Sequence, residues 1–276
     1  MTAPRVSVLV PVYDAGATLA RALDSVAAQT DRDHEVVVVD DGSTDPATRA
    51  ALAAAAARPG VTLVRQENRG PAAARNAAAA RARGAYLLPL DADDWLAPAF
   101  LARTVPLLEA DPALDVVHTW VGLAGAHSGV WCTGPFAIPA LLARCTVHVT
   151  SLVRRRTWER VGGWDETFRE GAEDWEFWIA AAAAGARGAC VPEVLCHYHR
   201  GAASRERGAR TPERSRALAR RLVAKHRALY AAHLDEAFAG LYAEYARTAD
   251  ALERVYALAP LRWWTRLRAQ LRGGRA

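Results

Sequence analysis

Three aspartates crowd into four positions of the segment AYLLPLDADDWLAP, residues 85–98: Asp91, Asp93 and Asp94. They follow an apolar run that is typical of a buried strand, and a tryptophan comes directly after them. Carboxylates this close repel one another, so the sequence predicts that a positive group completes the site. The alternative is an acidic turn whose aspartates cap a helix that begins near Pro98.

These aspartates follow the last of four strand patterns that alternate with helical stretches in the first ninety residues. The strand patterns are RVSVLVPVY (5–13), EVVVVDD (35–41), VTLVRQ (61–66) and AYLLPL (85–90). Right-handed crossovers turn such a chain into a parallel sheet, whose active groups gather at the carboxyl ends of the strands. We therefore expect Asp40 and Asp41, which end the second strand, to lie at the same edge as Asp91 and Asp93.

The second half of the chain is less regular. Short strand candidates are DVVHTWVG (115–122) and VHVTSLVRR (147–155), and a helix over 173–185 precedes a strand over 189–199. From Thr211 to about Ala257 the periodicity is helical, with a break near His233. The sequence thus predicts an α/β fold with a C-terminal helical extension.

Composition agrees with a large globular domain, because 51% of the 276 residues are hydrophobic. No run of about 18 uncharged apolar residues occurs and no signal-peptide pattern opens the chain, so we expect a cytoplasmic protein. The four cysteines have no CxxC spacing, which favours reduced, mostly buried thiols. Net charge is +5, and residues 201–276 are basic, with 16 Arg or Lys against 7 acids.

Five segments in series resemble an inverting family 2 glycosyltransferase with the GT-A fold. They occur in that family's order over roughly residues 5–205: SVLVPVYDAG, VVVVDDGSTD, ENRGPAAARNAAAARARGAYLLPLDADDWL, VGGWDETFREGAEDWEFW and CHYHRGAAS. One of these motifs alone would say little, but the series is specific. The resemblance implies a mostly parallel central sheet flanked by helices, and transfer of a sugar from a nucleotide sugar. It does not cover the chain after Gly208.

The resemblance assigns Asp91-Ala92-Asp93 to a divalent metal that holds the diphosphate of the donor. Hard oxygen ligands suit Mn²⁺ or Mg²⁺, and such ions bind through one or two carboxylates plus substrate phosphates. The implied cation is the positive group that the crowded aspartates require. His199 takes the position of a histidine that serves as a third metal ligand or a phosphate contact, with an ordinary surface position as the alternative.

The resemblance also implies a nucleotide pocket, formed by Pro11, Val12, Tyr13, Asp14, Asp40, Asp41, Arg75, Asp91, Ala92 and Asp93. Asp40 and Asp41 match base and ribose contacts, since a carboxylate can accept a ring N–H of uracil or thymine. Their alternative role is a turn before a helix that Asp45 caps. Asparagine is more usual at Asp14, and Arg69 is an alternative to Arg75.

In GAEDWEFW the family pattern places the catalytic base at Asp174, with Glu173 beside it. Removing the proton of the acceptor hydroxyl as the new bond forms lowers the barrier, by about 10² to 10⁴ in rate. A helix start favours an ionised aspartate, as a base requires. The alternative is that the two acids only complement the helix dipole. Trp95 and Trp175 are candidates to line the sugar site.

The predicted function is metal-dependent, inverting transfer of a sugar from UDP or dTDP to an acceptor hydroxyl of a carbohydrate, glycolipid or small molecule, in cell-envelope or natural-product glycosylation. The alternative is a catalytically inactive nucleotide-sugar-binding or membrane-recruited scaffold, against which the intact Asp91, Asp93 and Asp174 argue. No GxGxxG follows the first strand, which disfavours a dinucleotide oxidoreductase. The body has no module for reading nucleic acid.

The domain prediction is a GT-A domain over 1–208, with a nucleotide-sugar half (1–95) and an acceptor and catalytic half (96–208), followed by a basic helical extension over 209–276. The segment LRWWTRLRAQLR (261–272) has the composition of a helix that lies on a lipid surface, which predicts peripheral contact with the inner face of the cell membrane. Packing on its own domain and a homodimer contact are the alternatives. The sequence does not determine the donor sugar, the acceptor or the oligomeric state.

Overall fold

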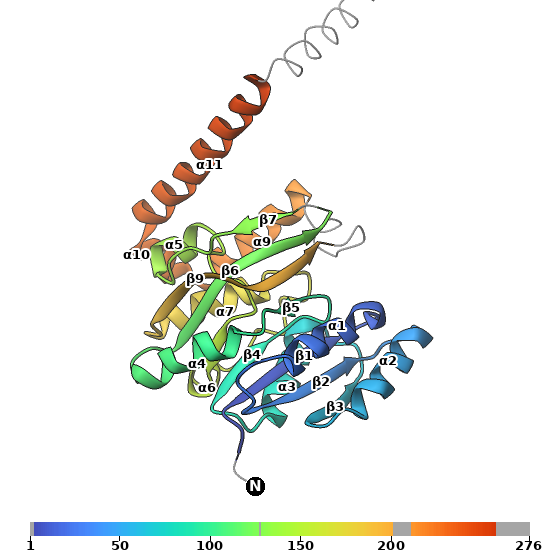
Figure 1. Cartoon of the computed structure of the whole chain (residues 1–276). Helices are drawn as coiled ribbons and strands as arrows, with labels where there is room; N and C mark the ends of the chain where they lie inside the picture. Colours follow the sequence, from blue (N-terminus) through green and yellow to red (C-terminus); the bar gives the residue numbers. More distant parts are fainter. Residues whose placement is uncertain (1–2, 127, 201–210, 258–276) are drawn as a thin grey trace, which may run out of the picture.

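The structure, a computed structural model, describes residues 3–126, 128–200 and 211–257. The described elements alternate between strand and helix through most of the chain (Figure 1). They are β1 (Val6–Val12), α1 (Gly16–Ala27), β2 (His34–Asp41), α2 (Pro46–Ala56), β3 (Val61–Gln66), α3 (Pro71–Arg81), β4 (Tyr86–Pro89), β5 (Trp95–Leu96), α4 (Phe100–Ala110), β6 (Val116–Gly125), β7 (Gly129–Trp131), α5 (Ile138–Ala143), β8 (Leu152–Arg154), α6 (Arg155–Val161), α7 (Glu173–Ala183), β9 (Gly188–Arg200), α9 (Pro212–Lys225), α10 (Arg227–Ala232) and α11 (Leu234–Ala257).

The described strands form one nine-stranded sheet in the order β3-β2-β1-β4-β8-β6-β9-β5, with β7 paired to β6. β3, β2, β1 and β4 are parallel, as the alternating pattern predicts, and β6 is parallel to β9. The short β8 is antiparallel to both β4 and β6 and joins these two parallel groups. The prediction of a mostly parallel α/β sheet is therefore confirmed.

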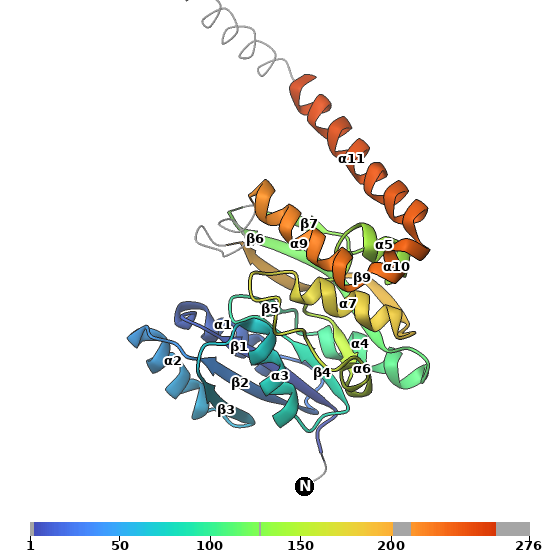
Figure 2. The ribbon, with the colours of Figure 1, turned by 180° about the vertical axis from the view of Figure 1, so that it is seen from behind.

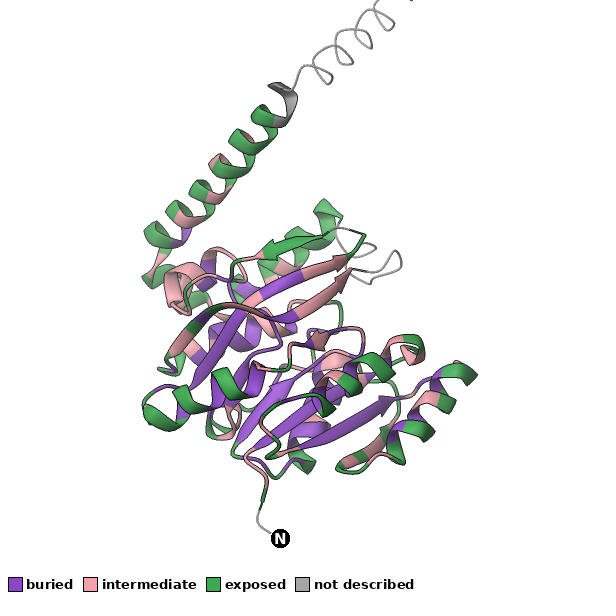
Figure 3. Cartoon of the chain, viewed as in Figure 1, coloured by how far each residue is buried: buried purple, intermediate pink, exposed green. Residues whose placement is uncertain are grey.

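The sheet has a hydrophobic core on both of its faces, and alternate strand residues supply the two sides. Val8 and Val10 of β1 pack in a cluster with α1, α2 and α4, whereas Leu9 between them packs in a cluster with α3 and α7. The buried strands form the centre of the molecule in Figure 3. Helices thus cover both faces, and the polar groups that end the strands are left at the sheet edge.

Three details differ from the sequence prediction. Only Leu152–Arg154 of the segment 147–155 is strand, because residues 147–151 bend while staying buried. The helical tail breaks near His233, as predicted, and also at His226. All four cysteines are free, as predicted, but Cys132 and Cys190 are exposed rather than buried.

The helical tail packs partly on the body. Leu222 of α9 and Ala237 of α11 are buried in the same cluster as Phe177 and Trp178 of α7. Figures 1 and 2 show α11 extending away from the rest of the chain. None of the described helices has the length and apolar character needed to span a membrane. The segment 261–272 lies outside the described residues, and the domain boundaries stay predictions.

Candidate functional site

The three crowded aspartates form a turn between β4 and β5, at the carboxyl end of β4. The backbone N–H of Asp94 donates to the carbonyl of Asp91 at 3.0 Å. Arg21 of α1 donates from Nη2 to the carbonyl of Asp93 at 2.8 Å. The next helix, α4, has Ala99 as its N-cap and no capping side chain, so the alternative that these aspartates cap a helix is wrong. The turn presents its acids at the sheet edge where active groups gather.

Asp94 differs from its neighbours because it is fully buried. Its Oδ1 accepts the backbone N–H of His199 at 2.9 Å, which attaches the end of β9 to the turn. Its Oδ2 has no hydrogen-bond partner among the described residues and lies 3.9 Å from Nε2 of His148. Burial, and then the charges of Asp91 and Asp93, raise the pKa of Asp94 well above its ordinary value. Asp94 therefore holds β9 beside the Asp91–Asp93 turn.

Arg75 connects two acidic clusters that lie far apart in the sequence. It is 2% exposed on α3, and it donates from Nη2 to Asp91 and from Nη1 to Glu173, each at 2.7 Å. Burial lowers the pKa of Arg75, but the carboxylates of Asp91 and Glu173 outweigh this effect, and the net pKa is raised. The prediction that Arg75 contacts the nucleotide stays a prediction; in this structure its guanidinium contacts the two carboxylates.

Asp174 stands beside that bridge, in the first turn of α7. Burial, and then the charge of the adjacent Glu173, raise the pKa of Asp174 to about 7, although Arg75 opposes the rise. The expectation was that the helix start favours an ionised aspartate, but burial and Glu173 outweigh the helix dipole, so the group is only partly ionised at neutral pH. A carboxylate with this pKa can accept a proton near neutral pH, which is the property of a general base.

The carboxylates that follow β2 have different surroundings. Asp41 is buried and accepts three hydrogen bonds: from Gln66 Nε2 at 2.7 Å, from the N–H of Arg69 at 2.9 Å and from the N–H of Gly70 at 2.8 Å. Asp40 accepts the N–H of Ser43 at 2.9 Å. Asp41 thus orders the loop before α3. The nucleotide contacts of both residues stay predictions.

The opposite wall of the predicted pocket, at the end of β1, is only partly available to a ligand. Val12 is buried in the core, Pro11 is half-buried, and Tyr13 is 42% exposed. Asp14 has a φ of 48° and accepts the backbone N–H groups of Thr44 and Asp45.

These contacts give Asp14 a structural role. The N–H of Asp45 and then the Thr44 N–H lower the pKa of Asp14. A carboxylate accepts these bonds as well as an asparagine does, so an aspartate fits this position, and its contact with the nucleotide stays a prediction.

Asn76, a residue that sequence reasoning did not single out, fastens the GGWDE segment to α3. Its Oδ1 accepts the N–H of Trp164 at 2.9 Å and the indole N–H of Trp158 at 3.1 Å, and its Nδ2 donates to the carbonyl of Trp164 at 2.8 Å. A Cβ on Gly163 would lie 2.5 Å from Asn76 Oδ1. Asn76 therefore fixes the segment that leads into α7, directly beside the Arg75 bridge.

The aromatic candidates have structural contacts. Trp95 stacks on His197, with ring centroids 5.0 Å apart, and Arg21 lies 4.0 Å above the Trp95 ring. Trp95 thus contacts both His197 and Arg21, and its role in lining the sugar site stays a prediction. Trp175 donates from its indole nitrogen to the carbonyl of Leu141 at 2.6 Å.

The predicted metal ligands are two acids of one turn and a histidine of β9. Across residues 3–126, 128–200 and 211–257, no three His, Cys, Asp or Glu side chains gather as a group able to hold a metal ion. Asp91 and Asp93 are hard oxygen donors on a single turn, and they suit a cation that takes its other ligands from a diphosphate and water. The role of His199 as a third ligand stays a prediction.

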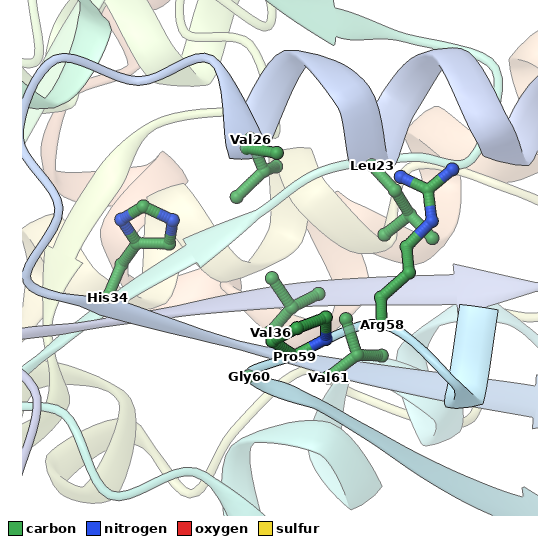
Figure 4. A pocket seen from close by; sticks show the side chains of 9 residues that line it. Leu23, Val26, His34, Val36, Arg58, Pro59, Gly60 and Val61 are labelled. Carbon is green, nitrogen blue, oxygen red and sulfur yellow. The ribbon is translucent and has the colours of Figure 1, made fainter.

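A cavity of about 290 Å³ lies at the opposite ends of the strands from the acidic site (Figure 4). Apolar side chains of α1, β2 and β3 line most of it, together with His34 and Arg58. Arg58 pairs with Asp24 at 2.7 Å. Since His34 begins β2 and Val61 begins β3, this cavity is at the amino ends of the strands, away from the acidic site. No residue of the acidic site lines it.

Comparison with known proteins shows which family the chain resembles. Residues 7–126 match the model of glycosyl transferase family 2. The succinoglycan biosynthesis protein ExoO of Rhizobium meliloti is 34% identical over 214 residues, which are 71% of this chain and 61% of that protein. The chondroitin synthase of Escherichia coli is 27% identical over 186 residues, 66% of this chain and 27% of that protein. The chain thus spans less than two thirds of either relative.

Two solved structures resemble the fold. Staphylococcus aureus TarS, residues 1–349, in complex with UDP-GlcNAc has a TM-score of 0.68 at 20% identity, over 85% of this chain and 73% of that one. The mannosyltransferase PcManGT from Pyrobaculum calidifontis, in complex with GDP-Man and Mn²⁺, has a TM-score of 0.60 at 25% identity, over 98% of this chain and 85% of that one. The family match over residues 7–126, these relatives and the shared sheet support the assignment of this chain to glycosyl transferase family 2, with the GT-A fold.

Proposed function

We propose that this chain transfers a sugar from a nucleoside-diphosphate sugar, with UDP or dTDP as the nucleotide, to an acceptor hydroxyl, and that the transfer inverts the anomeric centre. The observation that carries the proposal is the position of Arg75 between Asp91 and Glu173. This single side chain connects the turn proposed to face the donor diphosphate with the start of the helix that carries Asp174.

The proposed base is Asp174. Its carboxylate accepts the proton of the acceptor hydroxyl while the new bond from that oxygen to the anomeric carbon forms and the bond from this carbon to the diphosphate oxygen breaks. The electron pair of the broken bond leaves with the diphosphate. A pKa of about 7 suits this step, because the group is partly ionised at neutral pH and still basic enough to hold the proton.

Asp91 and Asp93 are the residues proposed to hold Mg²⁺ or Mn²⁺. When bound, such an ion stabilises the negative charge that develops on the leaving diphosphate. Arg75 orients Asp91 through its hydrogen bond, and Asp94 fixes the turn through its bond to the end of β9. The presence of Mn²⁺ in the PcManGT complex supports this choice of ion.

A carbohydrate is the favoured acceptor class, because the relatives carry the names of a succinoglycan biosynthesis protein and a chondroitin synthase. A glycolipid or a small natural product remains an alternative. The presence of UDP-GlcNAc in the TarS complex supports a uridine donor.

The test is release of nucleoside diphosphate from a panel of UDP-, dTDP- and GDP-sugars, with water or simple sugars as acceptor. The wild-type chain should turn over one nucleotide class, and Asp174→Asn should slow that turnover by about 10²-fold or more while donor affinity is kept. A matched control is Asp165→Asn, an acid of the GGWDE segment that pairs with Lys225 rather than with Arg75. Donor binding without any turnover by the wild type would favour the inactive-scaffold alternative.

A further inference from the structure

Large apolar side chains form an exposed stripe along α11. Figures 1 and 2 show this helix extending away from the body, and Figure 3 shows it mostly exposed. Six side chains make up what we call the apolar stripe: Leu234 (62% exposed), Phe238 (66%), Leu241 (54%), Tyr242 (64%), Tyr245 (69%) and Leu252 (52%). Amphipathic helices normally cover such a face, so its exposure points to a binding surface.

A different face of α11 attaches the helix to the body. Ala237 is buried, and a Cβ on Gly240 would lie 3.1 Å from the Cβ of Ala143 in α5. Arg144 approaches Glu244 at 3.7 Å. At roughly 100° per residue these positions lie about a quarter-turn or more from the centre of the stripe. The body therefore leaves the stripe uncovered over the described residues.

The spacing of the stripe is that of a helix that packs against another helix. Leu234, Phe238, Leu241, Tyr245, residue 248 and Leu252 alternate steps of four and three, which is the a/d pattern of a coiled-coil seam. Residue 248 is Thr248, whose hydroxyl donates to the carbonyl of Glu244 at 2.9 Å. The threonine thus brings no unpaired donor into the seam. A repeat of this kind is complementary to a second helix with the same repeat.

We propose that the apolar stripe of α11 pairs with the same stripe of a second copy of this chain, so that the protein is a homodimer through its projecting helices. The stripe exposes roughly 700 Å² per copy, since a large side chain carries about 150–250 Å². This approaches the area of about 800 Å² per partner in a standard stable interface. The proposal is independent of the proposed transferase activity.

The charges beside the stripe agree with self-pairing. The positions that flank an a/d seam are mostly uncharged here, namely Ala237, Tyr242, Ala249 and Ala251. The charged flanking positions are Asp235 and Glu244, and Arg144 and Arg247 lie beside Glu244. No row of like charges opposes a second copy.

The same charges argue against a lipid surface as the partner of this stripe. α11 carries five acids and two arginines, whereas a helix that lies on an anionic membrane has a polar face rich in Lys and Arg. The net charge of α11 is thus −3 and would be repelled by anionic lipid. A second copy of the chain is the occupant that the described residues favour.

The test is sedimentation equilibrium of the full chain from about 1 to 100 μM. The wild type should be a dimer, and Leu241→Glu/Tyr245→Glu should weaken the dimer by at least about 100-fold. The matched control, Ala239→Glu/Ala243→Glu, adds the same charges to exposed positions off the stripe and should stay dimeric. Glutamate is a good helix former, and circular dichroism checks that the helix is kept. The single variant Tyr245→Glu repeats the test with one change.

Three results would overturn the proposal. The first is a monomeric wild type over the whole concentration range. The second is an equal effect, or no effect, of the stripe and control variants, which would place the interface elsewhere. The third is a monomeric wild type that floats with vesicles of phosphatidylcholine and phosphatidylglycerol and loses this binding in the stripe variant, which would assign the stripe to lipid.

Discussion

Arg75 Nη2 and Asp91 Oδ1 lie 2.7 Å apart, although one residue is on α3 and the other follows β4. The same guanidinium contacts Glu173 of α7 at 2.7 Å. Three elements that are far apart in the sequence therefore meet at one buried arginine. Asp91 is proposed to act on the donor and Asp174 on the acceptor. The distance between the donor side and the acceptor side of the site therefore depends on this bridge.

Removing the bridge should destabilise the fold as well as the site. Arg75→Met leaves the buried carboxylate of Glu173 without its cation, and breaking a buried ion pair costs about 3–5 kcal/mol. Urea denaturation measures the loss of unfolding free energy. Arg69→Met is the matched control, because Arg69 pairs with Glu166 in an exposed position and such pairs contribute about 1 kcal/mol or less. Similar losses in the two variants would contradict a buried bridge.

The rate of diphosphate release should depend on pH through Asp174. As a base, Asp174 works only after losing its proton. The rate should therefore rise with pH, with the midpoint of this rising limb near pH 7, and then level off. Glu173→Gln removes a negative neighbour that raises this pKa, so the limb should move to lower pH. A pH–rate profile of each protein gives both midpoints. A limb near pH 4 in the wild type, or a shift to higher pH in the variant, would contradict this role.

Substitutions of Asp41 and Asp40 should differ in how much they lower the stability of the fold. Asp41→Ala removes the acceptor of the N–H groups of Arg69 and Gly70 in the loop before α3 and of the Gln66 side chain at the end of β3. These donors are partly buried, and leaving a fully buried donor unpaired costs about 1–3 kcal/mol, which is the upper bound for each. Asp40→Ala loses the bond from the N–H of Ser43 and should cost less stability. Thermal unfolding compares the variants. If Asp40→Ala is the less stable of the two, Asp41 does not order the loop.

Lys225, the one lysine in the sequence, should hold α9 to α7. Its Nζ contacts Asp165 at 2.6 Å and the buried Glu176 at 2.8 Å. Burial lowers the pKa of Lys225, but its hydrogen bonds to Asp165 and Glu176 outweigh this effect and raise it. Lys225→Met should therefore lower the midpoint of thermal unfolding clearly, whereas Arg216→Met, at an exposed pair, should not. Equal midpoints of thermal unfolding in the two variants would show that the contacts of Lys225 contribute little to the stability of the fold.

The sequence predicted the sheet and the place of the acidic clusters because both depend on local patterns. β-branched runs that alternate with helical stretches require parallel strands, and acids that follow such strands must lie at one edge. The segment 147–151 was wrongly predicted as strand, because its apolar residues are buried in a bend and not in the sheet. Burial and strand pairing produce the same apolar signal.

The contacts within the site could not be predicted from the sequence. An arginine that bridges Asp91 and Glu173, and an asparagine that holds Trp164, depend on how α3 and α7 pack across the sheet, and no spacing encodes this. The raised pKa of Asp174 could not be predicted for the same reason, since its burial and its position beside Glu173 are properties of the folded chain. The sequence predicted that α11 is helical but not that its apolar stripe is exposed, because the sequence does not tell which face of the helix the body covers.

The most direct test of a donor site at Asp91 and Asp93 is calorimetric titration of the full chain with UDP, dTDP and GDP, each with and without Mn²⁺. We predict that one uridine or thymidine nucleotide binds, that Mn²⁺ strengthens its binding at least about tenfold, and that Asp91→Asn/Asp93→Asn abolishes this gain. Equal affinity with and without Mn²⁺, or an unchanged gain in the double variant, would contradict the account.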